Sequence, residues 1–555
     1  MKRILFPLLA AAIGMAAGAG AQAAERTIRI DARYLNIPVS HAQPRHTLGL
    51  RCEGVDDLDV QVRIAPGTGE DYWVFKDLSR YGRGKLLTLT YDGPQEALDR
   101  LYQADTLQGG SQMYREALRP QFHFTTRRGW INDPNGLIWH EGLYHLFYQH
   151  NPYEREWGNM HWGHAVSRDL LHWEELDDAL FPDETGTMFS GSAVLDRNNS
   201  SGFGSKKRAP LVLAYTADGE NQTQCIAYST DGGRTLQKFA RNPVIDSHAR
   251  WDSHDTRDPR LLWYAPGAHW VMVLCERDGH SFYTSDNLKD WTFRSHIRGF
   301  WECPDLFELP VDGDPSNTMW VLSGASGTYM IGDFDGFEFK PRGSKYRYSY
   351  GAMYAAQTYS EIPDGRRIQI GWGKMKIPGM PFNGLMLLPT QLTLRTTVDG
   401  VRIFSEPVRE VQSLLERQYT ATGDLSAEEA NTILSRVLGT DESSCLGDGL
   451  HIHCRIALSY ATSAGLDLDG QHLVDYDTNQ NLVNGHPYSA EDPTAMEFET
   501  DIYVDRTSVE LFVDSGALSC SFPRSQGNRR DGLHFWGREI TVRELSVDRV
   551  KSIWQ

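Results

Sequence analysis

The amino-acid sequence predicts an all-β protein: a five-bladed β-propeller followed by a C-terminal β-sandwich, with a small extra β domain at the N-terminus. Three observations lead to this prediction. Residues 121–400 consist of many short strand-like runs with almost no helical periodicity. A loose sequence repeat runs through the same region. Residues 419–555 return to strand patterns, with a strong hairpin pattern at 502–514 that favours a sandwich.

The repeat is a strand followed by an aspartate and then, a few residues later, an aromatic side chain. It occurs at Asp169, Asp231 and Asp286, and weakly at 333–337, so the aspartates are 62 (169 to 231) and 55 (231 to 286) residues apart. Blades of four strands give such spacing, and at about 50–60 residues per blade this region holds about five. A β-sandwich is the second choice here, because it would give more uniform strands without the repeat.

Residues 1–23 have the pattern of a secretory signal peptide. A short basic start precedes an apolar, alanine-rich stretch that ends in Ala-Gln-Ala at 21–23. A membrane anchor is the alternative, but the stretch is barely long enough to span, contains Gly and Pro, and has no charged flank on its far side. The first cysteine is Cys52, which excludes a lipid-modified cysteine at the cleavage site. We therefore expect a secreted or periplasmic protein without membrane insertion.

The segments around the propeller are assigned from local patterns. Residues 24–92 alternate polar and apolar side chains and predict an N-terminal β accessory domain. Helix-forming residues predict a partly helical linker at 93–120 and a linker helix at 401–418. The accessory domain is expected to be a scaffold packed on the propeller rather than a carbohydrate-binding module, because its aromatic residues alternate as core residues do.

Composition limits the partners. The formal charge is -18, and loss of Lys2 and Arg3 with the signal peptide makes it about -20, which argues against nucleic acid and for a neutral substrate. The seven cysteines show no CxxC pair and no zinc spacing, and their odd number leaves at least one thiol unpaired. A disulfide between Cys445 and Cys454 stays open, as does the oligomeric state.

Three acidic residues stand in unusual settings. Asp133 lies in a rigid Asn-Asp-Pro-Asn-Gly run, Asp258 precedes a proline, and Glu302 lies two residues before one. They belong to different repeats, and a propeller brings the first strand of each blade to a common axis, so the three can converge. Paired carboxylates with a neutral substrate are typical of glycoside hydrolysis. The alternative for Asp133 is a purely structural turn.

Two other motifs are interpreted as structural. His140 and His145 resemble a zinc-binding helix motif, but their spacing is one residue too long and Gly142 lies where a hairpin turns. The Ser-Gly-Ser run at 190–192 lacks the flanking glycines of a nucleophile elbow.

Joined to their surroundings, these residues resemble glycoside hydrolase family 32, the invertase, inulinase and levanase family. The resemblance covers about residues 120–550 in family order and is carried by HFTTRRGWINDPNG (123–136), LYHLFYQHNPYEREWGNMHWGHAVSRDLLHW (143–173), MFSGSAV (188–194), TRDPR (256–260), ECPDLFEL (302–309), YGAMYAAQT (350–358), QIGWG (369–373) and DIYVDRTSVELFV (501–513). It implies a five-bladed propeller followed by a β-sandwich. The N-terminal domain and linker most resemble secreted bacterial levanase-like members.

Carried over to this sequence, the resemblance implies that Asp133 is the nucleophile, Asp258 the transition-state stabiliser and Glu302 the acid/base. The residues implied to line the fructose pocket are Asn132, Gln149, Trp157, Ser190, Arg257 and Trp372. The chain departs from the family at 381–394, where arginines are usual, so details near Thr390 are expected to differ.

The implied reaction is double displacement with retention on the β-fructofuranosidic bonds of levan, inulin or sucrose. It is expected to be exo-acting and to need no metal and no organic cofactor. Within the family, endo-levanase and fructosyltransferase activity are alternatives. An arabinanase-type five-bladed hydrolase is a further one, against which the sequence around Trp157 and Ser190 argues. An inactive fructan-binding protein is the non-enzymatic alternative.

Overall fold

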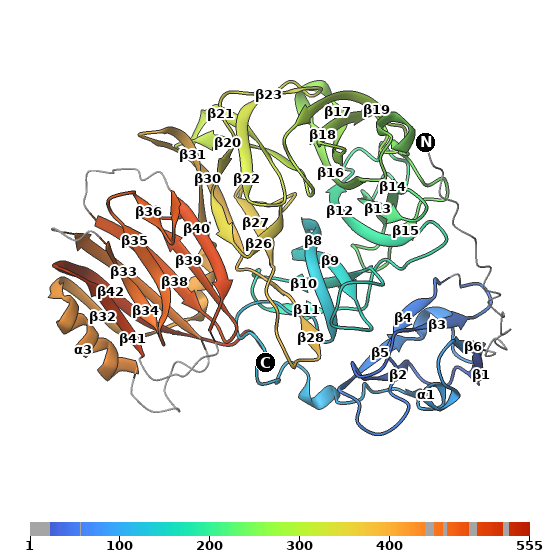
Figure 1. Ribbon diagram of the computed structural model, residues 1–555. Coiled ribbons are helices and arrows are strands. Elements are labelled where there is room, and N and C mark those ends of the chain that lie inside the picture. The colour runs from blue at the N-terminus through green and yellow to red at the C-terminus, as the bar shows by residue number, and fades with distance from the viewer. Residues whose placement is uncertain are drawn as a thin grey trace, which may run out of the picture.

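The computed structural model describes residues 23–55, 57–438, 449–458, 463–487, 497–525 and 532–554. The predicted signal peptide, except its last residue, lies outside the described residues, and so does Cys445 of the candidate disulfide. No helix within the described ranges combines the length and apolar character that a membrane crossing requires. Strands are the main secondary structure of the described chain, and they form an N-terminal domain, a central ring of sheets and a C-terminal sandwich (Figure 1).

The N-terminal domain consists of two small sheets. One has the order β1 (Ala24–Arg29), β6 (Leu86–Tyr91), β3 (His46–Arg51) and β4 (Val60–Val62), and the other β5 (Tyr72–Asp77), β2 (Tyr34–Val39) and β7 (Tyr102–Ala104). The segment 93–120 is partly helical, with α1 (Gln95–Asp99) and a 3-10 turn at Gly110–Gln112. Because β7 pairs with β2, however, the first part of this segment belongs to the domain rather than to a linker.

The central region is a ring of mainly antiparallel sheets. Three of them are separate sheets. The first contains β8 (Gly129–His140), β9 (Leu143–Asn151), β10 (His161–Ser167), β11 (Trp173–Glu175) and the short β28 (Phe382–Asn383), and the second contains β12 (Thr187–Leu195), β13 (Leu211–Asp218), β14 (Gln222–Ser229) and β15 (Gln237–Lys238). The third contains β16 (Thr256–Tyr264), β17 (His269–Glu276), β18 (Gly279–Ser285) and β19 (Thr292–Arg298). The innermost strands β8, β12 and β16 contact one another in turn, as the blades of a propeller do.

The rest of the ring is one ten-stranded sheet. Its strands are β20 (Asp305–Val311), β21 (Asp314–Ser323), β22 (Thr328–Phe334), β23 (Phe339–Pro341), β24 (Tyr346–Arg347), β26 (Met353–Thr358), β27 (Arg367–Gly373), β29 (Leu385–Met386), β30 (Thr390–Thr397) and β31 (Gly400–Pro407). One parallel contact, Val311 with Leu394, joins its two halves. The inner strand β20 contacts β16, and β26 contacts β8, which closes the ring. The blade count of five stays a prediction.

The sequence repeat proves to be the turn after the third strand of successive sheets. The Ser167 hydroxyl donates to Asp169 at 3.0 Å after β10, and the Ser229 hydroxyl donates to Asp231 at 2.7 Å after β14. After β18 the equivalent acceptor of Ser285 is Asn287, at 3.2 Å, so Asp286 was the wrong member of this copy. An amide oxygen accepts the same hydrogen bond, which a search for aspartate alone overlooks.

The predicted linker helix at 401–418 is wrong. Residues 400–407 form β31, which pairs with β30 along its whole length, and Ile403 and Phe404 are buried in that sheet. Only Arg409–Leu414 is helical, as a 3-10 helix, before β32 (Leu415–Ser426) begins. Sheet pairing outweighs the helix propensity of this segment.

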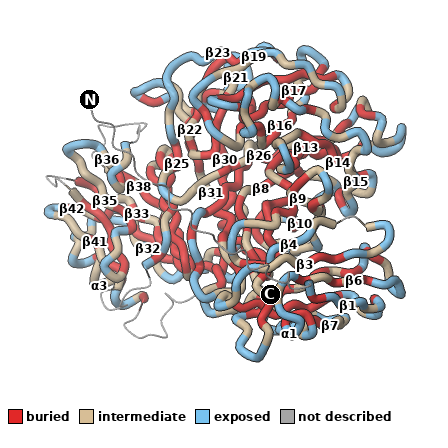
Figure 2. Tube along the Cα trace, turned by 45° about the vertical axis from the view of Figure 1, so that its right-hand side comes forward, coloured by how far each residue is buried: buried red, intermediate tan, exposed pale blue. Residues whose placement is uncertain are grey.

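The C-terminal sandwich packs a seven-stranded sheet on a five-stranded sheet. The first contains β25 (Ser349–Gly351), β40 (Leu518–Pro523), β39 (Ser508–Val513), β38 (Glu497–Val504), β33 (Leu450–Leu458), β42 (Ile540–Val550) and β32, and the second β37 (His486–Pro487), β36 (Leu482–Val483), β35 (Gln471–Asp477), β34 (Ser463–Leu468) and β41 (Leu533–Gly537). The predicted hairpin is confirmed as β38 paired with β39. In Figure 2 the buried segments follow the strands of both regions.

Two features of the sandwich were not predicted. Helix α3 (Ala427–Leu438) packs on β41 and β32. A buried histidine also joins the sandwich to the start of the propeller, since both ring nitrogens of His123 bond carboxylates of the sandwich, Asp505 at 2.7 Å and Glu510 at 2.6 Å. The two domains therefore share an interface rather than only a linker.

Candidate active site

A cavity of about 400 Å³ opens at the centre of the ring of sheets. Its walls come from the inner strands and the loops beside them, and the lining residues are Asn132, Asp133, Gln149, Trp157, Phe189, Ser190, Gln222, Asp255, Arg257, Asp258, Glu302, Tyr354 and Trp372. The structure thus brings together all nine residues selected from the sequence. The volume of the cavity is typical of a site for a small ligand.

Asp133 lies on β8 at an irregularity in the pairing with β9. The register shifts between Ile131 and Pro134, and such a bulge turns a side chain away from the regular alternation. The Ser190 hydroxyl donates to one carboxylate oxygen of Asp133 at 2.7 Å, and the Asn132 amide donates to the other at 3.1 Å. Both oxygens are therefore oriented by neutral donors.

Asp258 lies on β16 at a second bulge, between Arg257 and Arg260, with a φ of +65°. This left-handed backbone conformation is unfavourable for residues other than glycine, and such strain is concentrated at functional sites. The Thr216 hydroxyl accepts the backbone N–H of Asp258 at 3.0 Å, and the Cys303 N–H donates to the Asp258 carboxylate at 2.9 Å. Asp258 as a whole residue is 7% exposed.

Glu302 and Cys303 precede β20 and both have positive φ, at 50° and 42°. Arg257 donates to one Glu302 carboxylate oxygen at 2.9 Å, while the Tyr354 hydroxyl donates to the other in a short hydrogen bond. Arg257 also stacks over the exposed Trp301 ring, 5.1 Å from its centroid. Glu302 is therefore held from two sides, by a cation and by a phenol.

The two aspartates of the cavity have raised pKa values, because they are buried and lie next to other negative charges. Burial, together with the neighbouring Asp133 carboxylate, raises the pKa of Asp258 to about 7, although Arg257 opposes the shift. Burial also raises the pKa of Asp133, against the hydrogen bonds from Ser190 and Asn132. Strong perturbation in a cleft is typical of catalytic groups.

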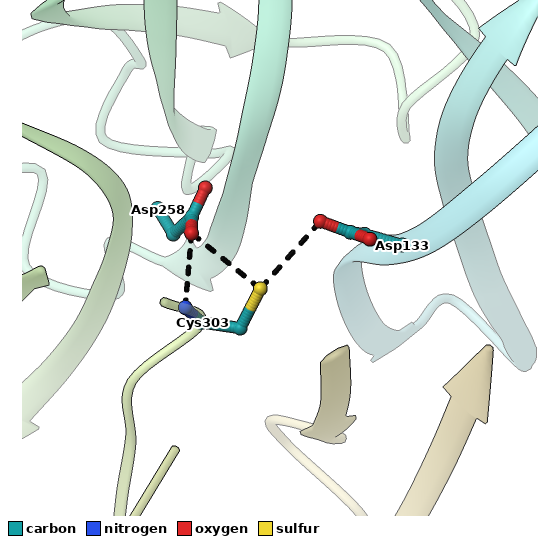
Figure 3. Close-up of side chains that lie close together, drawn as sticks. All are labelled: Asp133, Asp258 and Cys303. Atoms are coloured by element: carbon teal, nitrogen blue, oxygen red, sulfur yellow. Dashed lines mark hydrogen bonds between the residues drawn. The ribbon is translucent and has the colours of Figure 1, made fainter. Parts of the chain in front are cut away.

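The Cys303 thiol lies between the two aspartates (Figure 3). Its sulfur is 3.5 Å from a carboxylate oxygen of Asp133 and 3.5 Å from one of Asp258. These three donor atoms lie within 4.8 Å of one another, so a thiophilic divalent cation such as Zn²⁺ fits their chemistry. A cation there would occupy the carboxylates that the expected reaction uses.

The remaining walls suit a sugar ring. Trp372 is buried against Trp130, with ring centroids 5.7 Å apart, whereas Trp157 stands 54% exposed with its ring near Phe189. The Gln149 amide is fixed by donation to the Met188 carbonyl at 2.8 Å. Apolar faces beside amides and a guanidinium match a ring that carries hydroxyl groups.

Four lining residues were missed from the sequence: Phe189, Gln222, Asp255 and Tyr354. Asp255 accepts from Arg257 at 2.7 Å, and Gln222 accepts from the same guanidinium at 3.1 Å. The family-like run 350–358 includes Tyr354 and could have indicated it. Gln222 stands in an ordinary strand and carries no local signal.

Comparison with known proteins gives consistent matches. Residues 123–407 match the family model described as the glycosyl hydrolases family 32 N-terminal domain. A levanase of Bacillus subtilis is 38% identical over 498 residues, covering 80% of this chain and 72% of the relative. An extracellular exo-inulinase of Aspergillus niger is 33% identical over 521 residues, covering 80% and 96%. The crystal structure of exo-inulinase from Aspergillus awamori superposes with a TM-score of 0.69 at 28% identity, covering 80% of this chain and all of that one.

Proposed function

Because the chain belongs to glycoside hydrolase family 32 and is a β-fructofuranosidase-type glycoside hydrolase, we propose that it hydrolyses fructans, levan and inulin, from their non-reducing ends and releases fructose. The observation that carries the proposal is that Asp133, Asp258 and Glu302 line one cavity whose walls are otherwise aromatic, amide and guanidinium groups. Two carboxyl groups across a glycosidic bond are what this hydrolysis needs.

In the proposed first step, Asp133 attacks the anomeric C2 of the terminal fructofuranose while Glu302 protonates the departing oxygen. The bond from C2 to that oxygen breaks, and a fructosyl ester forms on Asp133. In the second step Glu302 removes a proton from water, the water oxygen attacks C2, and the ester bond to Asp133 breaks. Fructose leaves with retained configuration, and both carboxyl groups return to their starting states.

The hydrogen bonds of the cavity support these roles. Ser190 and Asn132 orient Asp133 for attack, and Arg257 and Tyr354 fix the position of Glu302. Asp258 is held by the backbone of Cys303 and is proposed to stabilise the positive charge that develops on the ring. Each acid thus has neighbours that restrict its orientation before the substrate binds.

Exo attack is supported by the size of the cavity and by two of the relatives. A cavity of about 400 Å³ with Trp157 at its edge and Trp372 in its wall suits one terminal ring. The names of the Aspergillus relatives specify exo-inulinase, and that of the Bacillus subtilis relative specifies levanase. Levan is proposed as the better substrate, since the levanase of Bacillus subtilis is 38% identical to this chain and the exo-inulinase of Aspergillus niger is 33% identical.

The finer points of architecture and location are also proposals. If the two halves of the ten-stranded sheet count as two blades, the propeller has five. The described elements are consistent with boundaries near residues 120 and 414, since β32 begins at Leu415. The signal-peptide pattern of residues 1–23 and the extracellular relative support secretion or export to the periplasm.

Time-resolved chromatography of levan and inulin digests tests the proposed function. Fructose as the sole early product is the expected result. A ladder of oligosaccharides before free fructose would show endo attack, and products longer than the substrate at high sucrose would show fructosyl transfer. Binding of fructan without any product would show an inactive binding protein.

A further inference from the structure

Trp157 stands on a segment that has no regular structure of its own. Residues 152–160 connect β9 to β10 without forming a helix or strand. Trp157 lines the cavity yet is 54% exposed, and its ring meets Phe189 edge-on at 6.0 Å. The position of this indole therefore depends on what holds the backbone on either side of it.

Two arginines of the N-terminal domain hold the residues just before Trp157. Arg45 donates to Glu154 at 2.7 Å and to Glu156 at 2.7 Å. Arg63 donates to the same two carboxylates at 2.7 Å and 3.2 Å, and its backbone N–H adds a bond to Glu154 at 3.0 Å. Glu154 is completely buried. Each guanidinium thus bridges two carboxylates, the geometry that arginine fixes best.

Asn159, two residues after Trp157, is also held by the N-terminal domain. The Asn159 side-chain amide pairs with the backbone of Gln61 in β4, accepting from its N–H at 2.8 Å and donating to its carbonyl at 2.8 Å. Asn159 has a φ of +44°, which asparagine tolerates well. The ring of Tyr153 is packed in the core of the N-terminal domain. Both flanks of Trp157 are therefore anchored to the N-terminal domain, in addition to the bond inside the propeller from the Asn151 amide to the Glu156 carbonyl at 2.7 Å.

The match to the family model begins at residue 123, after the N-terminal sheets. We propose that the N-terminal domain completes the active site: Arg45 and Arg63 are positioning residues that fix Trp157 at the cavity mouth, where it holds the sugar next to the bound fructose. The proposal rests on the proposed fructan hydrolysis. An indole that is already fixed improves substrate binding, because segment 152–160 does not have to become ordered when the fructan binds.

The test compares two substrates that share the terminal ring. Methyl β-D-fructofuranoside ends there, whereas the trisaccharide 1-kestose continues past the cavity mouth. We expect Arg63→Ala to raise KM for 1-kestose about tenfold and to change KM for the methyl glycoside by less than about threefold. Trp157→Ala should raise KM for 1-kestose by at least as much. The double variant Arg63→Ala with Trp157→Ala should have a KM for 1-kestose no higher than that of Trp157→Ala alone.

Arg33→Ala is the matched control, because Arg33 also joins the N-terminal domain to the propeller, through Asp177 at 2.7 Å, and has no contact with segment 152–160 among the described residues. It should leave KM for 1-kestose unchanged, and Arg63→Lys should recover part of the loss. Equal KM values for Arg63→Ala and wild type, with only a lower Tm, would reduce these arginines to structural ties and overturn the proposal. So would additive effects in the double variant.

Two further measurements keep the outcomes separable. If Arg63→Ala does not fold, Asn159→Asp removes the donations to Gln61 and Asn151 while keeping the shape of the side chain, and it must raise KM for 1-kestose in the same way. If the wild type hydrolyses neither compound, the proposed function fails. The role of Arg45 and Arg63 in positioning Trp157 is then tested by calorimetry with 1-kestose, in which Arg63→Ala must weaken binding and Arg33→Ala must not.

Discussion

At the scale of single residues, Asp133 and Glu302 have different partners, which agrees with the different tasks proposed for them. Asp133 is oriented by the neutral donors Ser190 and Asn132, while Glu302 is bonded by Arg257 and Tyr354. Asp133→Asn and Glu302→Gln keep these shapes but remove the proposed nucleophile or the proposed proton donor. We expect each to lower kcat by about three decades or more, roughly 4 kcal/mol of barrier, measured as fructose release.

Asp286→Asn serves as the control for these two variants. Asp286 is exposed and follows β18 in the same fold, so its replacement should leave kcat within about twofold of the wild type. Circular dichroism must show both active-site variants folded. Near-normal turnover in either folded variant would refute its assigned role.

The ionised Asp258 side chain lowers the stability of the folded protein, so its replacement should raise that stability. Its pKa of about 7 lies above the ordinary value near 3.9, so the folded state binds the proton more tightly than the unfolded state, and stability is lost as pH rises to about 7. Asp258→Asn should therefore stabilise the protein at pH 8 by on the order of 2–4 kcal/mol and not at pH 4, while lowering kcat. Thermal unfolding at the two pH values checks this. Equal destabilisation at both would contradict it.

The sequence predicted the charged centre of this site better than its surroundings. Asp133, Asp258 and Glu302 stand out because each is followed closely by proline, a local signal. Tyr354 reaches Glu302 only through folding, since 52 residues separate them. Cys303 was counted only as a thiol, although its sulfur lies between two carboxylates. Contacts made by the tertiary structure leave no trace in local patterns.

At the scale of strands, the cavity is built from bulges in the inner strands. Register shifts occur in β8 next to Asp133, in β12 between Phe189 and Gly191, in β16 next to Asp258 and in β26 just after Tyr354. Each bulge interrupts the alternation of side chains and allows a polar group to point into the cavity. Strand patterns alone predict the sheets but not these local shifts.

Gly191 tests this view of β12. A Cβ at this position would lie 1.9 Å from the Ala214 carbonyl oxygen on the neighbouring strand, so β12 would have to move away from β13. That movement would carry Ser190 away from Asp133. We expect Gly191→Ala to destabilise the protein by about 2–3 kcal/mol and to lower kcat at least tenfold. Gly67→Ala, with no atom within 4 Å, should change neither. Normal stability and kcat in Gly191→Ala would contradict the close approach.

Helix α3 was missed although the sequence carried its signal. Ala430, Leu434 and Leu438 are buried at intervals of four residues, and Ser426 with Glu429 forms a reciprocal capping pair at its start. The linker helix at 401–418 was the opposite error, since residues with helix propensity are paired along β30. In both cases the correct choice depends on which sheet is available to pack against.

At the scale of the whole molecule, the propeller is fixed from two sides. The N-terminal domain holds the segment of Trp157 through Arg45 and Arg63, and the sandwich holds the entry to the propeller through His123. The sequence predicted three β domains in order, but not that the outer two would contact the central one at such specific points. The contacts join residues that are 91 to 387 positions apart.

His123 makes the attachment of the sandwich dependent on pH. Although burial opposes it, hydrogen bonds to Asp505 and Glu510 raise the pKa of His123 to about 9, above its ordinary value near 6.5. The stabilisation is therefore complete below about pH 6.5 and is lost as pH rises through about 9, a change of about 3 kcal/mol. Urea midpoints should fall between pH 6.5 and 9.5 in the wild type, and His123→Gln should be less stable at pH 6.5 but lose much less over this range. A wild-type midpoint that stays constant, or an equally steep decline in His123→Gln, would show that this buried histidine does not carry the charge.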